Sequence, residues 1–103
     1  MPSDVLPDAL RWLFPDAEIE RLDVERDANG ILPRILEHGR LEDVVWALRT
    51  YGPERIHAFF IDVGHPELSP RTIAFWRAYF QASEEKWVER PSFRTSSAAP
   101  WPL

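Results

Sequence analysis

Apolar residues recur every three or four positions between residues 41 and 80, which is the spacing of one face of an α-helix. In the first segment this face consists of Leu41, Val44, Val45, Leu48 and Tyr51. Gly52 is suited to end such a helix, and Pro53 is suited to the first turn of the next one. The pattern therefore predicts a helix over residues 41–51 that turns this face toward the core.

Two more helices are predicted after this one. The first covers residues 53–63, and its apolar face consists of Ile56, Phe59, Phe60 and Val63. The second covers residues 69–80, where Ser69 is a favoured N-cap residue and Pro70 fits the first turn. Its apolar face consists of Ile73, Trp76, Tyr79 and Phe80, and Phe75 widens that face.

The N-terminal segment predicts a short helix followed by a polar connector. Residues 3–14 have an apolar face, with Pro7 in the first turn and Pro15 directly after the last. Residues 16–27 are mostly charged, which indicates a connector or a single turn along the surface.

A further helix is predicted over residues 31–38. Pro33 is expected in its first turn, because a proline deeper in the helix would remove a backbone hydrogen bond. Gly39 is expected to end this helix in the left-handed conformation.

These elements together predict an all-α fold, a compact bundle of four to five short helices in residues 1–83. After residue 83 the helical pattern is lost, and residues 84–103 contain three prolines and a Ser/Ala run. This segment is expected to be a flexible tail. Because Trp87, Phe93 and Trp101 are spaced along it, we expect the tail to dock on its own domain or on a partner.

Composition narrows the classes of function. The chain has 103 residues, which is enough for one domain, and a net charge of −5. An acidic chain is poorly suited to nucleic acid and better suited to a basic protein partner. It has no cysteine, no signal peptide and no apolar run long enough to cross a membrane, so we expect a cytoplasmic protein.

No residue pattern indicates a catalytic or metal site. His38, His57 and His65 do not have the spacing of metal ligands, so solvated or capping roles are expected for them. Ser69 is better explained as an N-cap than as a nucleophile, and no Gly-rich phosphate loop is present. We therefore expect a protein without enzymatic activity and without a cofactor.

Several large residues lie outside the predicted core faces. Trp46 is nearly opposite the apolar face of its helix, and Arg49 is on the flank near it. Either the central helix is buried on two sides, or these residues form an exposed patch of the kind that binds partners. The predicted partner-binding residues are Trp46, Arg49, Trp76, Arg77, Trp87, Phe93 and Trp101.

A helix-turn-helix is the alternative interpretation. The helices over residues 53–63 and 69–80 are joined by a short loop, and the second could place Arg71, Thr72 and Arg77 against DNA. The aromatic residues of the second helix argue that much of it belongs to the core.

A series of short motifs resembles a family of small prokaryotic proteins of unknown function. The match covers residues 12–80 and departs from the family pattern at Gly30 and Pro33. The matching positions are Leu13, Phe14, Asp16, Leu22, Asp23, Ile35, Leu36, Gly39, Leu41, Asp43, Tyr51, Gly52, Leu68, Ser69, Arg71, Thr72, Phe75 and Trp76. Members of this family look like the small partner encoded beside nucleotidyltransferase-type toxins of the abortive-infection class.

The resemblance implies an antitoxin-like role that depends on binding another protein. The sequence therefore predicts a protein-binding module whose partner is a nucleotidyltransferase-type toxin. DNA binding and homodimer formation remain open alternatives.

Overall fold

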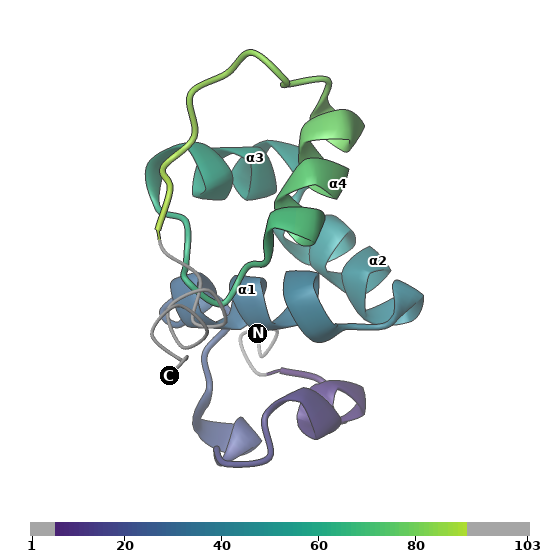
Figure 1. Cartoon of the computed structure of the whole chain (residues 1–103). Coiled ribbons are helices and arrows are strands. Elements are labelled where there is room, and N and C mark those ends of the chain that lie inside the picture. The colour runs from purple at the N-terminus through teal and green to yellow at the C-terminus, as the bar shows by residue number, and fades with distance from the viewer. Residues whose placement is uncertain (1–5, 91–103) are drawn as a thin grey trace, which may run out of the picture.

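All regular elements of residues 6–90, the part of the chain that the structure describes, are helical (Figure 1). In this computed structural model, the 3-10 helices are η2 (Asp8–Leu13) and η3 (Ile19–Arg21), and the α-helices are α1 (Ala28–His38), α2 (Leu41–Tyr51), α3 (Pro53–Asp62) and α4 (Pro70–Phe80). The predicted all-α bundle of short helices is confirmed. None of the helices within residues 6–90 is long and apolar enough to cross a membrane.

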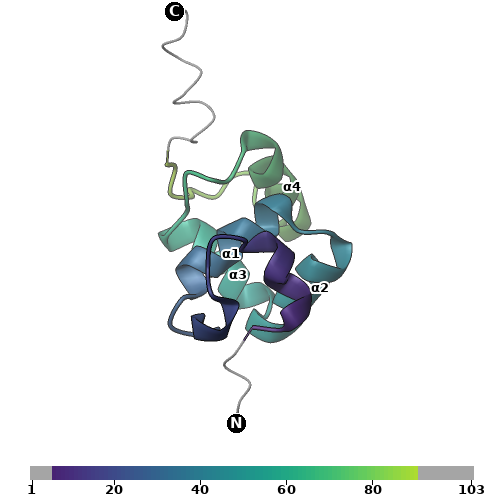
Figure 2. The same cartoon turned by 90° about the horizontal axis from the view of Figure 1, so that it is seen from below.

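The helices are arranged around α1. η2 and α2 pack against α1, and α3 packs against α2. In Figure 1, η2 lies below α1, and the helices α3 and α4 lie above it. In Figure 2, which is seen from below, η2 is the purple helix beside the label of α1. After α4, residues 81–90 pass over α3, where the Val88 N–H donates to the carbonyl of Phe60 (3.3 Å).

The core takes residues from each of these layers. α1 contributes Ile31, Leu32 and Ile35, which are almost completely buried. α3 and α4 add the side chains of Phe60 and Trp76, which are also buried. Large apolar groups from both sides of α1 are therefore removed from water together, which is the main favourable term in folding.

The N-terminal segment differs in detail from its prediction. Among the described residues, the helix expected over residues 3–14 is the shorter 3-10 helix η2. Pro7 lies at its N-cap and not in its first turn. The charged connector contains one helical turn, η3, as expected. Arg34 of α1 holds this region, because its Nη1 donates to the carbonyl of Leu13 (2.8 Å) and its Nε to Glu67 (2.8 Å).

The predicted start of the helix over residues 31–38 is wrong. α1 begins at Ala28, so Pro33 lies inside the helix rather than in its first turn. The helix starts early because the carbonyl of Asp27 accepts hydrogen bonds from the N–H groups of Gly30 and Ile31 (both 2.9 Å). Pro33 cannot donate to the carbonyl of Asn29, but Asn29 is exposed and water can bind that carbonyl.

The predicted role of Gly39 is also wrong. Gly39 follows α1 with φ −71° and ψ 155°, which is extended rather than left-handed backbone. A Cβ atom at this position would lie 2.5 Å from the carbonyl oxygen of Ile35 and 3.1 Å from Cβ of Asp43. Glycine is therefore needed here because α1 and α2 approach closely.

The rotation of α2 corrects the prediction for Leu41. α2 buries Asp43, Ala47 and Tyr51, of which only Tyr51 belongs to the apolar face that the pattern indicates. The Asp43 carboxylate points inward because it accepts the backbone N–H of Arg40 (2.9 Å) at the start of the helix. Leu41 is consequently 78% exposed.

The joints on either side of α3 are those predicted. Gly52 separates α2 from α3 with φ 89° and ψ 150°, a region that side-chain-bearing residues rarely adopt. Ser69 caps α4, and its Oγ accepts the backbone N–H of Thr72 (3.2 Å).

Tyr51 connects the end of α2 to the N-terminal segment. Its buried hydroxyl donates to the carbonyl of Val24 (2.7 Å). Burial of the phenol is the main cause that raises the pKa of Tyr51 from 10.0 to about 12.

Replacement of Gly52 should test the α2–α3 joint. Gly52→Ala is expected to lower the free energy of unfolding by about 1–3 kcal/mol, because alanine is strained in this backbone conformation. Gly30→Ala is the matched control. Gly30 lies in α1 with nothing within 4 Å of an added Cβ, so alanine should raise the free energy of unfolding by about 0.5–1 kcal/mol. Urea unfolding of both variants measures the difference, and equal effects would contradict the assignment.

The Tyr51 hydroxyl should make stability depend on pH in alkaline solution. Below pH 10.0 the phenol is protonated in the folded and unfolded chains, and its contribution is complete. Between pH 10.0 and about 12 the unfolded chain loses this proton first, so the free energy of unfolding should fall. Tyr51→Phe should cost about 1 kcal/mol at neutral pH and abolish this part of the fall.

Unfolding measured from pH 7 to pH 12 compares the two proteins. The two proteins differ only at this hydroxyl, so the difference between their curves reports on Tyr51. Parallel curves above pH 10.0 would show that Tyr51 is not the responsible group.

Candidate protein-binding surface

Trp76 belongs to the core and not to the surface. It is 2% exposed, and it is the one side chain that α4 buries completely. Its ring lies 6.2 Å from the ring of Phe60 and 5.6 Å from that of Phe80, measured between centroids. Trp76, which was predicted to bind a partner, therefore anchors α4 on α3.

Trp87 is also buried, at 5% exposed, although it was predicted in a flexible tail. Its ring stacks on Phe60 with centroids 4.6 Å apart and an interplanar angle of 22°. Its Nε1–H donates to Glu85 (2.9 Å), whose carboxylate also lies 2.7 Å from His57. The hydrogen bond from Trp87 is the main cause that lowers the pKa of Glu85, and the hydrogen bond with His57 is the second. Residues 84–90 thus pack against the helices.

Arg77 holds this C-terminal segment against α4. Its Nη1–H groups donate to the carbonyls of Ala82 (2.8 Å) and Glu85 (3.0 Å). Its guanidinium carbon also lies 4.5 Å from the centroid of the Trp87 ring, within cation–π distance. The structure therefore brings Trp76, Arg77 and Trp87 together in a packed cluster.

Trp46 and Arg49 have different surroundings on α2. Trp46 is half-buried, and its ring meets that of Tyr51 edge to face, with centroids 6.0 Å apart. Arg49 is exposed. Both can be reached by a partner, whereas the predicted residues Phe93 and Trp101 lie outside the described part of the chain.

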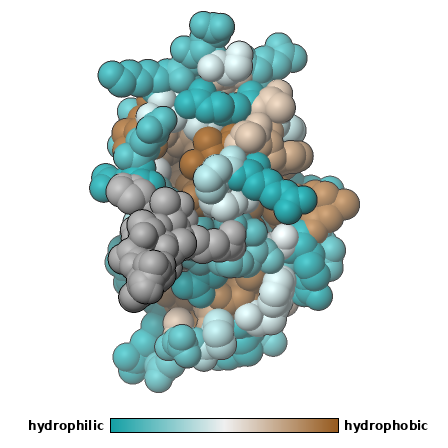
Figure 3. Space-filling model, in the orientation of Figure 1, coloured by the Kyte–Doolittle hydropathy of each residue, from teal (hydrophilic) through white to brown (hydrophobic). Residues whose placement is uncertain are grey.

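A different apolar surface is formed by α2 and α4, which we call the α2–α4 face. Leu41 is 78% exposed, Phe75 is 59% exposed and Tyr79 is 50% exposed. Ala74 and Ala78, also on α4, are exposed as well. Figure 3 shows hydrophobic side chains over the right-hand side of the molecule, where α2 and α4 lie in Figure 1. An exposed set of this kind is typical of a protein-binding surface.

An open groove of about 800 Å³ runs between the two helices of this face. Leu41 and Val44 form its wall on the side of α2, and Pro70 and Phe75 form its wall on the side of α4. Arg71 lies at its edge and is exposed. The groove thus offers apolar walls, the exposed cation of Arg71, and the carboxylate of Glu37, which accepts the backbone N–H of Ser69.

Sequence reasoning missed the α2–α4 face because it assigned Leu41 and Tyr79 to the core. A signal was present for Phe75, which lies at the margin of the apolar face of α4. Leu41 is at the first position of α2, where a side chain has few neighbours on its own helix. This position at the end of the helix is a signal in the sequence that Leu41 could be exposed.

The three residues of the DNA-binding alternative do not form a cationic patch. Arg71 is exposed, whereas Arg77 is bonded to backbone carbonyls. Thr72 is partly buried, and its hydroxyl accepts from Ser69 Oγ (3.2 Å). One exposed arginine is little for a helix that must neutralise several phosphates.

The histidines have partners on the protein. His38 Nε2 lies 3.0 Å from Glu67, and His57 Nε2 lies 2.7 Å from Glu85. His65 Nδ1 accepts the backbone N–H of Glu67 (3.0 Å). No cluster of three or more ligating side chains that could hold a metal ion occurs among residues 6–90.

A protein-family model matches about the first half of the chain. Residues 10–60, which extend from η2 into α3, match the model of a family of unknown function, DUF6922. No curated protein and no solved structure matches the chain. The match supports the resemblance to a family of unknown function that the sequence motifs indicate.

Proposed function

We propose that this protein is a non-enzymatic protein-binding module of the prokaryotic cytoplasm and acts as the antitoxin-like partner of a nucleotidyltransferase-type toxin. The observation that carries the proposal is the α2–α4 face, where Leu41 and Phe75 are exposed at a groove and Tyr79 is exposed on the same helix as Phe75. The sequence motifs of the resembling family supply the class of partner.

The hydrophobic effect gives this face a reason to bind. Burial of apolar surface is worth about 25 cal/mol per Å², and large aromatic side chains contribute most at protein interfaces. Phe75 and Tyr79 are already held by edge-to-face contacts with Trp76, at centroid distances of 5.2 and 5.0 Å. Little side-chain entropy would therefore be lost when a partner covers them.

The charge at the groove adds specificity. Arg71 is exposed and forms no salt bridge within residues 6–90. A carboxylate of the partner could pair with it at the edge of the apolar contact. Pairs of this kind mainly affect the orientation and the rate of association.

Two substitutions on the α2–α4 face test the proposal. The chain is co-purified with the product of the neighbouring gene, which the proposal expects to be a nucleotidyltransferase-type toxin, and the dissociation constant is measured by titration calorimetry. Leu41→Ala and Phe75→Ala should each weaken binding about tenfold or more, because each removes an exposed apolar anchor. Both should change the free energy of unfolding by no more than about 0.5 kcal/mol, since both side chains face solvent.

Thr50→Ala is the matched control, because Thr50 is exposed near the other end of α2. It should leave the dissociation constant unchanged. Trp46→Ala and Arg49→Ala test the second predicted region on α2. Failure of the toxin to form a complex would refute the proposed partner. A complex that tolerates both Leu41→Ala and Phe75→Ala would exclude the α2–α4 face, and salt-sensitive DNA binding lost in Arg71→Ala would support the regulator instead.

A further inference from the structure

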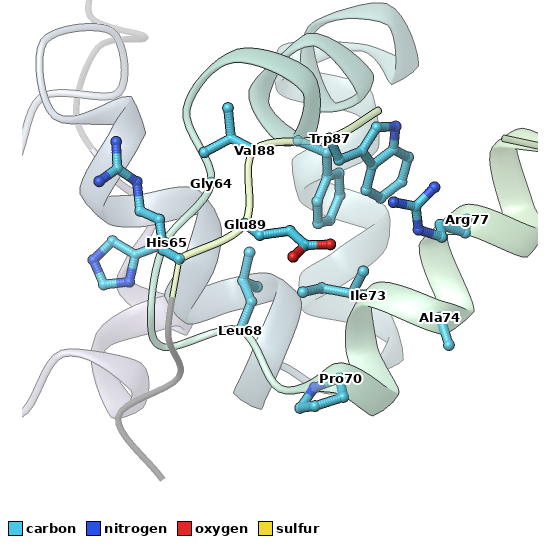
Figure 4. A pocket seen from close by; sticks show the side chains of 12 residues that line it. Gly64, His65, Leu68, Pro70, Ile73, Ala74, Arg77, Trp87, Val88 and Glu89 are labelled. Carbon is cyan, nitrogen blue, oxygen red and sulfur yellow. The ribbon is translucent and has the colours of Figure 1, made fainter. Parts of the chain in front are cut away.

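A second recess lies on another side of α4. It is a cavity of about 410 Å³ between the end of α3, the loop before α4, α4 itself and residues 87–90 (Figure 4). Its apolar walls include Phe60, Leu68, Ile73 and Trp87. Its size falls in the range of small-molecule sites, roughly 300–1,000 Å³, whereas protein interfaces are usually flatter.

The walls of this cavity are held in place by contacts that need no ligand. Trp87 stacks on Phe60, and the Val88 N–H donates to the Phe60 carbonyl (3.3 Å). Gly64 has φ 63°, and an added Cβ would lie 3.1 Å from the carbonyl oxygen of Val88. The loop before α4 and residues 87–90 are therefore in close contact, and the cavity is preformed.

Two guanidinium groups line the cavity. Arg77 uses Nη1 for the carbonyls of Ala82 and Glu85, while its Nε and Nη2 make no hydrogen bond to residues 6–90. Arg90 uses Nε for the carbonyl of Val63 (2.8 Å), which leaves its two terminal nitrogens without a partner in the same range. Each cation is thus fixed at one end and has donors available at the other.

A carboxylate lines the same cavity. Figure 4 shows the side chain of Glu89 directed into the space beside Ile73 and Leu68. Within the described residues, Glu89 forms no salt bridge with Arg77 or Arg90. The cavity therefore combines an apolar wall with charges of opposite sign that form no salt bridge with one another.

We propose that this cavity binds a small zwitterion with an apolar body, of the class of the apolar α-amino acids. The ligand carboxylate would accept hydrogen bonds from Nε and Nη2 of Arg77, and its ammonium group would pair with Glu89. Its side chain would pack against Phe60 and Ile73. A ligand with a single charge could pair with only one of Arg77 and Glu89, and would therefore lose one of the two charge-assisted hydrogen bonds.

This site adjoins the α2–α4 face but uses other residues. The cavity and the groove share Pro70 at the start of α4, whereas Ile73 and Arg77 line only the cavity and Arg71 and Phe75 line only the groove. The inference therefore does not depend on the proposed toxin partner, and either can fail alone.

Titration of the full chain with three related probes tests the site. L-phenylalanine carries both charges, 3-phenylpropionate lacks the ammonium group, and phenethylamine lacks the carboxylate. NMR is expected to show saturable shifts at the Trp87 indole N–H and at the Ile73 and Arg77 amides with L-phenylalanine. Each singly charged probe should bind about tenfold more weakly or worse, because a hydrogen bond to a charged group is lost.

Glu89→Gln is the decisive variant, since Glu89 is exposed and its replacement should leave the fold intact. It should weaken L-phenylalanine about tenfold and leave 3-phenylpropionate unchanged. Glu84→Gln is the matched control, because Glu84 is exposed on the same segment outside the cavity and should have no effect.

Three results would overturn the inference. The first is the absence of saturable shifts at the cavity residues with all three probes at about 10 mM, a concentration that would nearly saturate a site with a dissociation constant of about 1 mM. The second is equal affinity of the wild-type chain for L-phenylalanine and 3-phenylpropionate. The third is an equal loss in Glu89→Gln and Glu84→Gln, which would indicate a general effect of surface charge.

Discussion

The packing of Trp76 against Phe60 determines where the two proposed binding surfaces lie. α4 buries only Trp76 completely, so this ring is its main anchor on the rest of the bundle. Trp87 stacks on the same Phe60 ring and brings residues 84–90 against α3. One aromatic cluster thus places α4 between an apolar groove on one side and a charged cavity on the other. A change that moves α4 would alter both surfaces, whereas a change on its exposed residues would alter one.

The inward face of α2 explains why an apolar surface remains outside. α2 turns Ala47 and Asp43 toward the core, and these residues are small or are bonded at the start of the helix. The small side chain of Ala47 lets α2 approach its neighbours closely, and Gly39 makes the same approach possible at the preceding turn. Larger apolar residues are therefore left at the sides, and Leu41 is left in solvent. Its exposure follows from packing requirements of other residues.

The sequence predicts the elements better than their surroundings. Gly52, Pro53 and Ser69 act through local backbone chemistry, so the joints next to α3 and α4 could be located from the chain alone. The rotation of α2 could not be predicted, because apolar residues cover much of its circumference and several faces could be buried. Trp87 was expected to dock on its own domain or on a partner, but its place could not be predicted, since the segment around it has no period and its position depends on the distant residue Phe60. The α2–α4 face could therefore be predicted only in part.

The net charge of −5 describes the surface of this protein poorly at the place where binding is proposed. Many charged groups of the N-terminal half are paired, as in Arg11 with Asp8 and Glu20, and exposed pairs of this kind contribute little to stability. Arg71, by contrast, stands at the groove without a salt bridge among residues 6–90. A partner selected by the overall charge would be basic, but one selected by the groove needs apolar side chains and a carboxylate near Arg71. Because contacts at the interface decide specificity, the local arrangement is the better guide to the partner.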